Sequence, residues 1–179
     1  MKIFKFMKNL ILTLLFILSA SLTFGQKLVT NEVDEFTGNT IMETSWEVLN
    51  RKSKLSSYVR FRKIDNRIYL NFRMTSGYGS RTFSVDEGEV LYFKFSDDEI
   101  LKLSNTDYQL TTIGGGTIGL LGSHGVGLEL TCRISQEILA KLSQKTLDKV
   151  RVYTSIGYVE AEVKRKRAET FKELARLIN

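Results

Sequence analysis

The stretch that decides the fold runs from Tyr58 to Thr75 and reads YVRFRKIDNRIYLNFRMT. Apolar and polar side chains alternate on both sides of Asp65-Asn66, and both of these residues tolerate the positive φ that a two-residue hairpin loop needs. A hairpin closed at this loop makes the following cross-strand pairs: Ile64 with Arg67, Phe61 with Leu70, and Val59 with Phe72. All the large apolar side chains then fall on one face, and a shift of one residue would destroy that agreement. We therefore predict a hairpin in this register.

The opposite face of this hairpin is basic and aromatic. Its candidate binding residues are Tyr58, Arg60, Arg62, Tyr69 and Arg73. Arginine and tyrosine together can hold an anionic sugar, a lipid headgroup or an acidic protein through charge and cation–π contacts. The alternative is an ordinary solvated face with structural Arg–Tyr pairs, because antiparallel sheets usually show one polar face to water. The sequence leaves both interpretations open.

Outward from the hairpin, the same alternation predicts that most of the chain forms short antiparallel strands separated by turns. The expected strands are 27–33, 40–49, 81–85, 90–95, 100–103, 108–113, 126–134, 149–154 and 158–163, with a polar loop at 51–57. The last two of these strands form a second hairpin around Ser155-Ile156-Gly157.

Two segments have the periodicity of helices. Ser135 is a good N-cap for a short helix near 135–143, and Glu137 complements the dipole of its first turn. The last segment, near 164–178, carries one apolar stripe: Ala168, Phe171, Leu174, Ala175 and Ile178. Such a stripe has to cover apolar surface, and one face of the sheet is available. The predicted fold class is α+β, with a mainly antiparallel sheet of about eight or nine strands, or two packed layers as an alternative, and these two helices.

The first 25 residues have the pattern of a secretion signal. Three lysines come first, the apolar run 10–18 follows, and small residues lead to Gly25. This order is typical of a signal peptide, and the segment 10–25 is shorter than the roughly 20 residues that a membrane-spanning helix needs. We predict cleavage after Gly25, with Ser21 as the alternative site, so that residues 26–179 form one exported domain, periplasmic or extracellular. No cysteine lies near the cleavage site, so the product is not expected to be a lipoprotein.

Composition limits the classes of function. The chain carries a net charge of +6, and removing the three lysines of residues 1–25 leaves +3. A basic balance of this size does not argue for nucleic acid, so no nucleic-acid partner is expected. Cys132 is the only cysteine, and an intramolecular disulfide is therefore not expected. With no proline, linker or repeat in the sequence, we expect one domain that is stabilised by burial.

The most unusual stretch is 108–128, which has no charged residue and contains a glycine-rich run. It has neither the P-loop motif nor the dinucleotide-binding fingerprint. Ile118, Leu120 and Leu121 are candidates for insertion into a membrane or a partner. The alternative is a long, flexible β-connection whose leucines fold onto the sheet, because loop glycines are commonest in turns.

His124, the only histidine, lies in the same stretch and is a candidate general base or ligand. A zinc site needs three or four ligands, and His124 with Cys132 supplies two at most, so a solvated loop histidine is the simpler interpretation. The acidic turns 86–89 and 97–99 lack the spacing of an EF-hand calcium loop. We therefore predict no catalytic residues, no metal site and no cofactor.

Three strings stand out together: Asp34-Glu35-Phe36-Thr37-Gly38, Thr44-Ser45-Trp46-Glu47 and Lys149-Val150-Arg151-Val152-Tyr153. With the lysine-rich terminal helix that follows them, they resemble a group of small exported bacterial proteins without assigned activity. The resemblance covers most of residues 26–179. It implies an exported single domain and brings no catalytic residues.

The sequence predicts an exported, non-enzymatic binding or envelope-associated protein whose partner is an unidentified protein, glycan or lipid. One alternative is a hydrolase of an envelope polymer, with carboxylates that the sequence does not identify. Another is a peripheral membrane protein that docks through 108–128 and the basic run 164–167. A deep pocket with converging carboxylates would favour the hydrolase, and binding to liposomes would favour the membrane protein.

Overall fold

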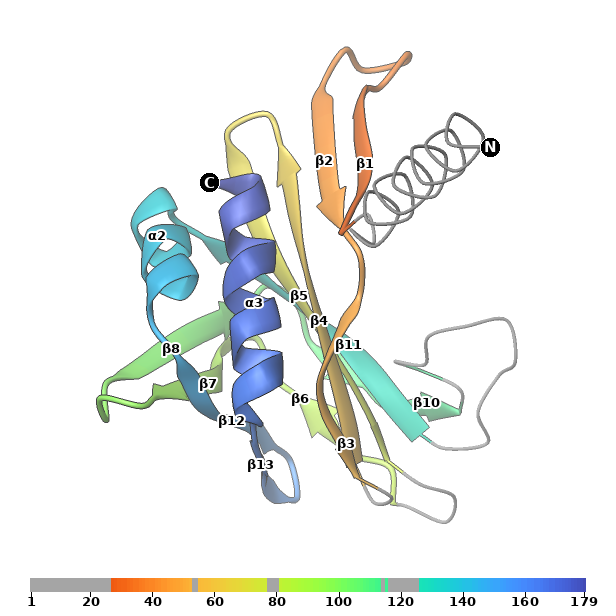
Figure 1. Ribbon diagram of the computed structural model, residues 1–179. Helices are drawn as coiled ribbons and strands as arrows, with labels where there is room; N and C mark the ends of the chain where they lie inside the picture. The colour runs from red at the N-terminus through yellow and green to blue at the C-terminus, as the bar shows by residue number, and fades with distance from the viewer. Residues whose placement is uncertain (1–26, 53–54, 77–80, 114, 116–125) are drawn as a thin grey trace, which may run out of the picture.

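The computed structural model describes residues 27–52, 55–76, 81–113, 115 and 126–179 (Figure 1). Its main feature is an antiparallel sheet of 11 strands, nine of which follow one another across the sheet. In spatial order these nine are β1 (Leu28–Val33), β2 (Thr40–Thr44), β4 (Leu55–Ile64), β5 (Arg67–Ser76), β11 (Val126–Ile134), β8 (Ile100–Asn105), β7 (Gly88–Phe95), β12 (Leu147–Thr154) and β13 (Gly157–Glu162).

The remaining strands are short or lie beside this path. β3 (Glu47–Lys52) pairs with β4, and β10 (Thr112–Ile113) pairs with β11. β6 (Ser84–Val85) and β9 (Gln109–Leu110) form a separate two-stranded sheet. Together with the helices α2 (Gln136–Gln144) and α3 (Arg165–Ile178), these strands confirm the predicted α+β class. The main sheet is continuous in its strand pairing, and inner side chains of β4 and β5 line one small cavity together with those of β12 and β13.

The β4–β5 hairpin has the register that its sequence predicts. Ile64 faces Arg67, and the pairs Phe61–Leu70 and Val59–Phe72 follow along the ladder. Asp65 takes up the loop with a φ of 50°. Val59, Phe61, Leu70 and Phe72 are buried in the core. Ile64 is the exception to the predicted one-sided pattern, because in this register it falls on the opposite face, in line with Arg60 and Arg62. The alternation in this one stretch therefore determines which face of the sheet is internal.

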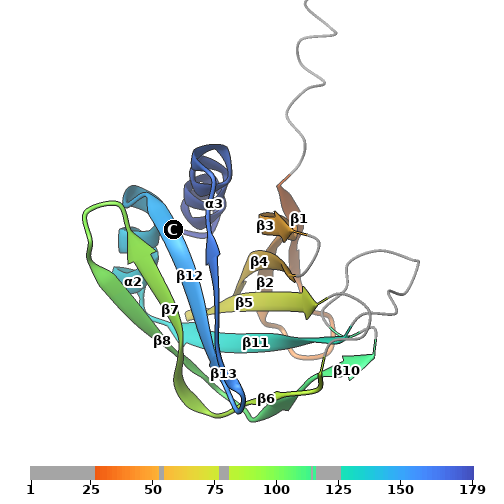
Figure 2. The same cartoon turned by 90° about the horizontal axis from the view of Figure 1, so that it is seen from below.

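The core lies between the inner face of the bent sheet and α3. Figure 2 shows the sheet curving around this helix, with β7, β8 and β12 on one side and β3 and β4 on the other. All five residues of the predicted apolar stripe of α3 are buried. The Phe171 ring lies 5.5 Å from that of Phe61 on β4 and 5.7 Å from that of Phe93 on β7. Phe171 thus joins the two halves of the sheet.

The cap of α2 also agrees with its sequence. The Ser135 hydroxyl accepts a hydrogen bond of 3.2 Å from the backbone N–H of Ile138, and Glu137 lies in the first turn. The helix packs against α3 and buries Leu139 and Leu142.

Four expectations about local structure are wrong. The single strand expected over 108–113 is broken at Thr111 into β9, which pairs with β6, and β10, which pairs with β11. The strand expected over 81–85 is limited to β6, Ser84–Val85. The single strand expected over 40–49 is broken at Ser45-Trp46 into β2 and β3, both of which pair with β4. The loop expected over 51–57 is narrower, because β3 runs to Lys52 and β4 begins at Leu55. Most residues of 51–57 are polar, which is why the sequence predicts a loop. Ser57 is nevertheless buried in β4, so its position in the sheet outweighs its polarity.

The glycine-rich stretch begins and ends beside β11. Gly115 and Gly127 lie so close that a Cβ on either would overlap the carbonyl oxygen of the other, and a Cβ on Gly127 would also overlap the carbonyl oxygen of Met74. Both glycines therefore serve a close backbone approach. The candidate residues Ile118, Leu120, Leu121 and His124 lie outside the described residues, as do residues 1–26.

Candidate functional site

The basic face predicted for the first hairpin is an ion-paired cluster on the outer side of β4 and β5. Arg60 lies 3.1 Å from Glu43, and Arg62 lies 2.7 Å from the other oxygen of the same carboxylate. Arg73 lies 2.7 Å from Glu129 of β11. Two carboxylates from neighbouring strands thus neutralise most of the charge of the three arginines.

The aromatic ring at the centre of this cluster is that of Trp46. The Arg60 guanidinium lies 4.7 Å from the centroid of the Trp46 ring, and that of Arg73 lies 4.2 Å from it. Trp46 reaches this position because it occupies the break between β2 and β3. We call this group the Trp46 cluster, and it consists of Glu43, Trp46, Arg60, Arg62, Arg73 and Glu129.

The predicted tyrosines are placed beside the Trp46 cluster. Tyr58 faces Arg73 across β4 and β5, and Tyr69 faces Arg62; both tyrosine side chains are half-buried. The structure therefore brings the five described candidate residues to one face. The sequence did not reveal that Trp46 would join them. It predicts one unbroken strand over 40–49, and such a strand does not place Trp46 over the arginines.

A second outer face lies on β8, β7, β12 and β13, in the other half of the sheet. The strand register arranges its side chains in three rows. The first row is Ile100, Lys94, Lys149 and Glu162; the second is Lys102, Tyr92, Arg151 and Glu160; the third is Tyr153 and Tyr158. We call these ten residues the lysine–tyrosine face.

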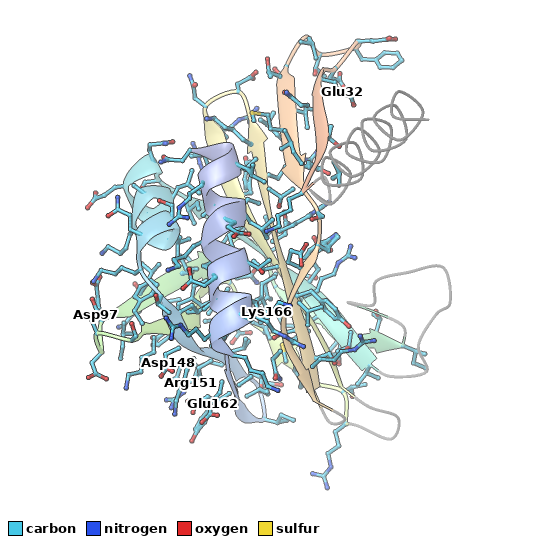
Figure 3. The ribbon with its side chains drawn as sticks, in the orientation of Figure 1. Glu32, Asp97, Asp148, Arg151, Glu162 and Lys166 are labelled. Atoms are coloured by element: carbon cyan, nitrogen blue, oxygen red, sulfur yellow. The ribbon has the colours of Figure 1, made fainter. Side chains whose placement is uncertain are left out.

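This face contains a hollow of about 100 Å³. It is lined by Tyr92, Lys94, Ile100, Lys149, Arg151 and Glu160. Three of the lining side chains are cationic and one is anionic, and Asp98 and Glu162 next to the hollow also pair with Lys94 and Lys149. Figure 3 shows Arg151 and Glu162 at the β12–β13 hairpin and Lys166 on the first turn of α3.

Two lysines of the hollow are directly opposite each other. Lys94 of β7 and Lys149 of β12 are cross-strand partners. The Lys94 ammonium donates a hydrogen bond of 2.7 Å to the Asp98 carboxylate, and this bond raises the pKa of Lys94. The Lys149 ammonium is 3.9 Å from Glu160 and 4.0 Å from Glu162, which is too long for a direct hydrogen bond. Carboxylates therefore compensate Lys94 at a short distance and Lys149 only at longer distances.

Arg151 is held in a fixed orientation beside these lysines. Its Nε and Nη2 donate to Glu160 over 2.8 Å and 2.6 Å, and its Nη1 donates to the Tyr153 hydroxyl over 3.3 Å. The guanidinium lies 4.3 Å from the centroid of the Tyr158 ring. The hydrogen bond to Tyr153 raises the pKa of Arg151 most, and the hydrogen bond to Glu160 raises it further. Arg151 therefore acts as a permanent positive charge with defined geometry.

The three tyrosines form a continuous aromatic rim. The rings of Tyr92 and Tyr153 are 5.0 Å apart, and those of Tyr153 and Tyr158 are 6.1 Å apart. Tyr158 is 58% exposed and Tyr153 is 38% exposed, so both side chains keep exposed surface, although Arg151 lies over the Tyr158 ring.

The sequence contains part of the signal for this second face. Lys149, Arg151 and Tyr153 alternate with Val150 and Val152, and the hairpin that carries them is confirmed. The sequence does not show that β12 pairs with β7, because these strands are far apart in the chain. This pairing places Lys149 opposite Lys94.

Cys132 is buried on the inner face of β11, as predicted for a small core residue. Burial raises the pKa of its thiol to about 12, so the thiol stays protonated at neutral pH. A protonated, buried thiol is not a nucleophile.

The acidic turn at 97–99 is tied to α2 through lysines. Lys145 binds both Asp97 and Glu99, and Lys141 lies 2.6 Å from Glu99. The side-chain hydrogen bonds from Lys145 lower the pKa of Asp97, and those from Lys141 and Lys145 lower that of Glu99. The carboxylates therefore anchor the turn to the helix. In the described part of the chain, no three His, Cys, Asp or Glu side chains are grouped as a metal site would need.

No helix among the described residues is long and apolar enough to cross a membrane. The basic run 164–167 precedes and opens α3, and its first three side chains are exposed.

No family model matches the chain, and searches of curated proteins and of solved structures also found no match. The description therefore depends on the fold and its surfaces: an α+β protein with a bent antiparallel sheet whose outer side presents two contrasting polar faces.

Proposed function

We propose that this protein is an exported, non-enzymatic binding protein that holds an anionic ligand on the lysine–tyrosine face. The observation that carries the proposal is the hollow in which Lys94 and Lys149 stand directly opposite each other. Charge-assisted hydrogen bonds from two ammonium groups to one anion are stronger than neutral ones. The nearest carboxylates leave Lys149 without a short contact, so its donors are available to a ligand.

The Trp46 cluster is a weaker candidate for the same role. Its arginines already have carboxylate partners at 2.7–3.1 Å and lie against the Trp46 ring. An incoming anion would have to displace these partners, whereas at Lys149 it would fill an open position.

The alternative of a polymer hydrolase receives less support from the hollow. Glycoside hydrolysis usually needs two carboxyl groups on either side of the scissile bond. Glu160 is the one carboxylate among the six lining residues, and it is ion-paired with Arg151. Docking through 108–128 remains a separate prediction, because most of the glycine-rich part of that stretch is outside the described residues.

The binding proposal is tested with poly-L-glutamate as a simple polyanion. We expect the purified protein to bind it in a salt-dependent manner, and Lys94→Gln with Lys149→Gln to weaken binding roughly tenfold, as lost charge-assisted contacts would do. The matched control is Arg165→Gln with Lys166→Gln, which removes the same charge from the exposed start of α3. An equal loss in both double variants, or no loss in the first, would contradict the proposal.

The export part of the proposal has its own test. Signal cleavage after Gly25 should leave Gln26 at the N-terminus of protein recovered from the exported fraction, which intact-mass spectrometry would reveal. Recovery of the uncleaved chain in the cytoplasm alone would contradict it.

A further inference from the structure

We propose that the ligand of the lysine–tyrosine face is an acidic polysaccharide, a glycan in which some sugar rings carry carboxylates. This inference rests on the proposed function and names the class of ligand. It is carried by three features that share one face of the sheet: the opposed lysines, the aromatic rim and the carboxylates between them.

The size of the hollow indicates a ligand that lies along the surface. Pockets that enclose a drug-sized molecule measure ~300–1,000 Å³. The hollow here is about 100 Å³, so it accepts one ring or one anionic group of a larger ligand. The rest of that ligand has to extend over neighbouring side chains.

The tyrosine rim gives the direction of that extension. Tyr153 is four residues beyond Lys149 on β12, which corresponds to ~13 Å along a strand. A ligand that runs the whole of this distance along the strand is an oligomer. Aromatic side chains offer large, rigid surfaces on which the apolar faces of sugar rings can stack.

The carboxylates of the face distinguish a glycan from a nucleic acid. Glu160 and Glu162 lie beside the cations in the second and first rows. Carboxylates accept hydrogen bonds from hydroxyl groups but repel phosphates. A ligand rich in hydroxyls with widely spaced charges fits this mixture better than a nucleic acid, whose charge repeats at every nucleotide.

The rim also distinguishes a glycan from an acidic peptide. Neutralisation of Lys94 and Lys149 needs only a carboxylate, which a peptide also offers. A peptide of acidic residues has no ring to stack on Tyr153 and Tyr158, so it would leave this exposed aromatic surface uncovered.

The experiment compares four polymers on the purified protein: polygalacturonate, poly-L-glutamate of matched charge, neutral dextran and single-stranded oligothymidylate. We expect polygalacturonate to bind roughly tenfold more tightly than poly-L-glutamate, since stacking of rings adds to the charge contacts. Dextran and oligothymidylate should bind less tightly than polygalacturonate.

The variants assign the difference to the rim. Tyr153→Thr with Tyr158→Thr should reduce polygalacturonate binding to the level of poly-L-glutamate, whereas Tyr153→Phe with Tyr158→Phe should retain it within about twofold, because the rings remain. Melting temperatures close to that of the parent would show that both double variants are folded.

The results separate this inference from the proposed function. Equal binding of the two polyanions, tighter binding of oligothymidylate, or no effect of the threonine variants would overturn the glycan inference, although poly-L-glutamate would still bind through the lysines. If neither polyanion binds, or if Lys94→Gln with Lys149→Gln binds both as well as the parent, the proposed function fails as well.

Discussion

The Trp46 cluster and the lysine–tyrosine face lie on the same side of one sheet but differ in how their charges are compensated. In the Trp46 cluster, Glu43 and Glu129 lie at short distances from the arginines, and two guanidinium groups lie close to the indole ring. On the lysine–tyrosine face, two cations stand opposite each other and one of them has only long contacts. A basic aromatic pattern in the sequence can therefore become a structural feature or a binding surface. The outcome depends on whether the neighbouring strands place carboxylates close to the cations.

The largest expected effect comes from Phe171, which contacts both halves of the sheet. Phe171→Ala removes a buried ring that touches Phe61 and Phe93 and should lower the free energy of unfolding by ~3–5 kcal/mol. Urea denaturation would measure the loss. Leu177→Ala, at a 41% exposed position of the same helix, is the control and should change stability far less.

The second effect is a difference in stability between substitutions on the two faces. Trp46→Ala removes the ring shared by Arg60 and Arg73 and is expected to destabilise the protein by roughly 1–3 kcal/mol, less than loss of a fully buried Trp. By contrast, Lys149→Gln should leave the urea midpoint nearly unchanged, because this lysine has only long contacts with carboxylates at the surface. A large destabilisation by Lys149→Gln would mean that this lysine is structural, as the arginines of the Trp46 cluster are.

The third effect concerns pH and the ion pairs at the edge of the lysine–tyrosine half. The pKa values of Asp97 and Glu99 are lowered in the folded protein, so the folded state binds fewer protons than the unfolded chain in acid. The stability they contribute is present above their ordinary pKa values of 3.8 and 4.5 and is lost as the pH falls through the lower folded values.

Thermal unfolding between neutral pH and pH 3 would measure this contribution. The melting temperature should fall less steeply with acid in Lys145→Gln than in the parent, because the variant lacks the cation that binds both carboxylates. Parallel curves for the two proteins would contradict this assignment.

The smallest effect is expected at Cys132, on the strand between the two halves. Its buried thiol, with a pKa raised to about 12, should not react with a thiol reagent at neutral pH until the protein unfolds. Rapid labelling of the native protein would show that β11 opens.

The features that could be predicted from the sequence are those with a local period. The register of β4–β5, the Ser135 cap and the buried stripe of α3 each follow from neighbouring residues in the chain. The break at Ser45-Trp46 did not follow, because its cause is the pairing of two short strands with one long partner, β4.

The same distinction applies to the candidate sites. The sequence located five residues of the Trp46 cluster's face, yet it did not supply the acidic partners from β2 and β11. It also contained the alternation of Lys149, Arg151 and Tyr153 without the pairing that sets Lys149 against Lys94. Contacts between strands far apart in the chain decide both cases.

The most direct test of the binding claim is an NMR titration of the isotope-labelled protein with polygalacturonate oligomers. We expect chemical-shift changes at the amides of β7, β12 and β13, centred on Lys94, Lys149 and Arg151, with little change at β4 and β5. Changes centred on Arg60 and Arg73, or no changes at a concentration at which polygalacturonate binds, would contradict it.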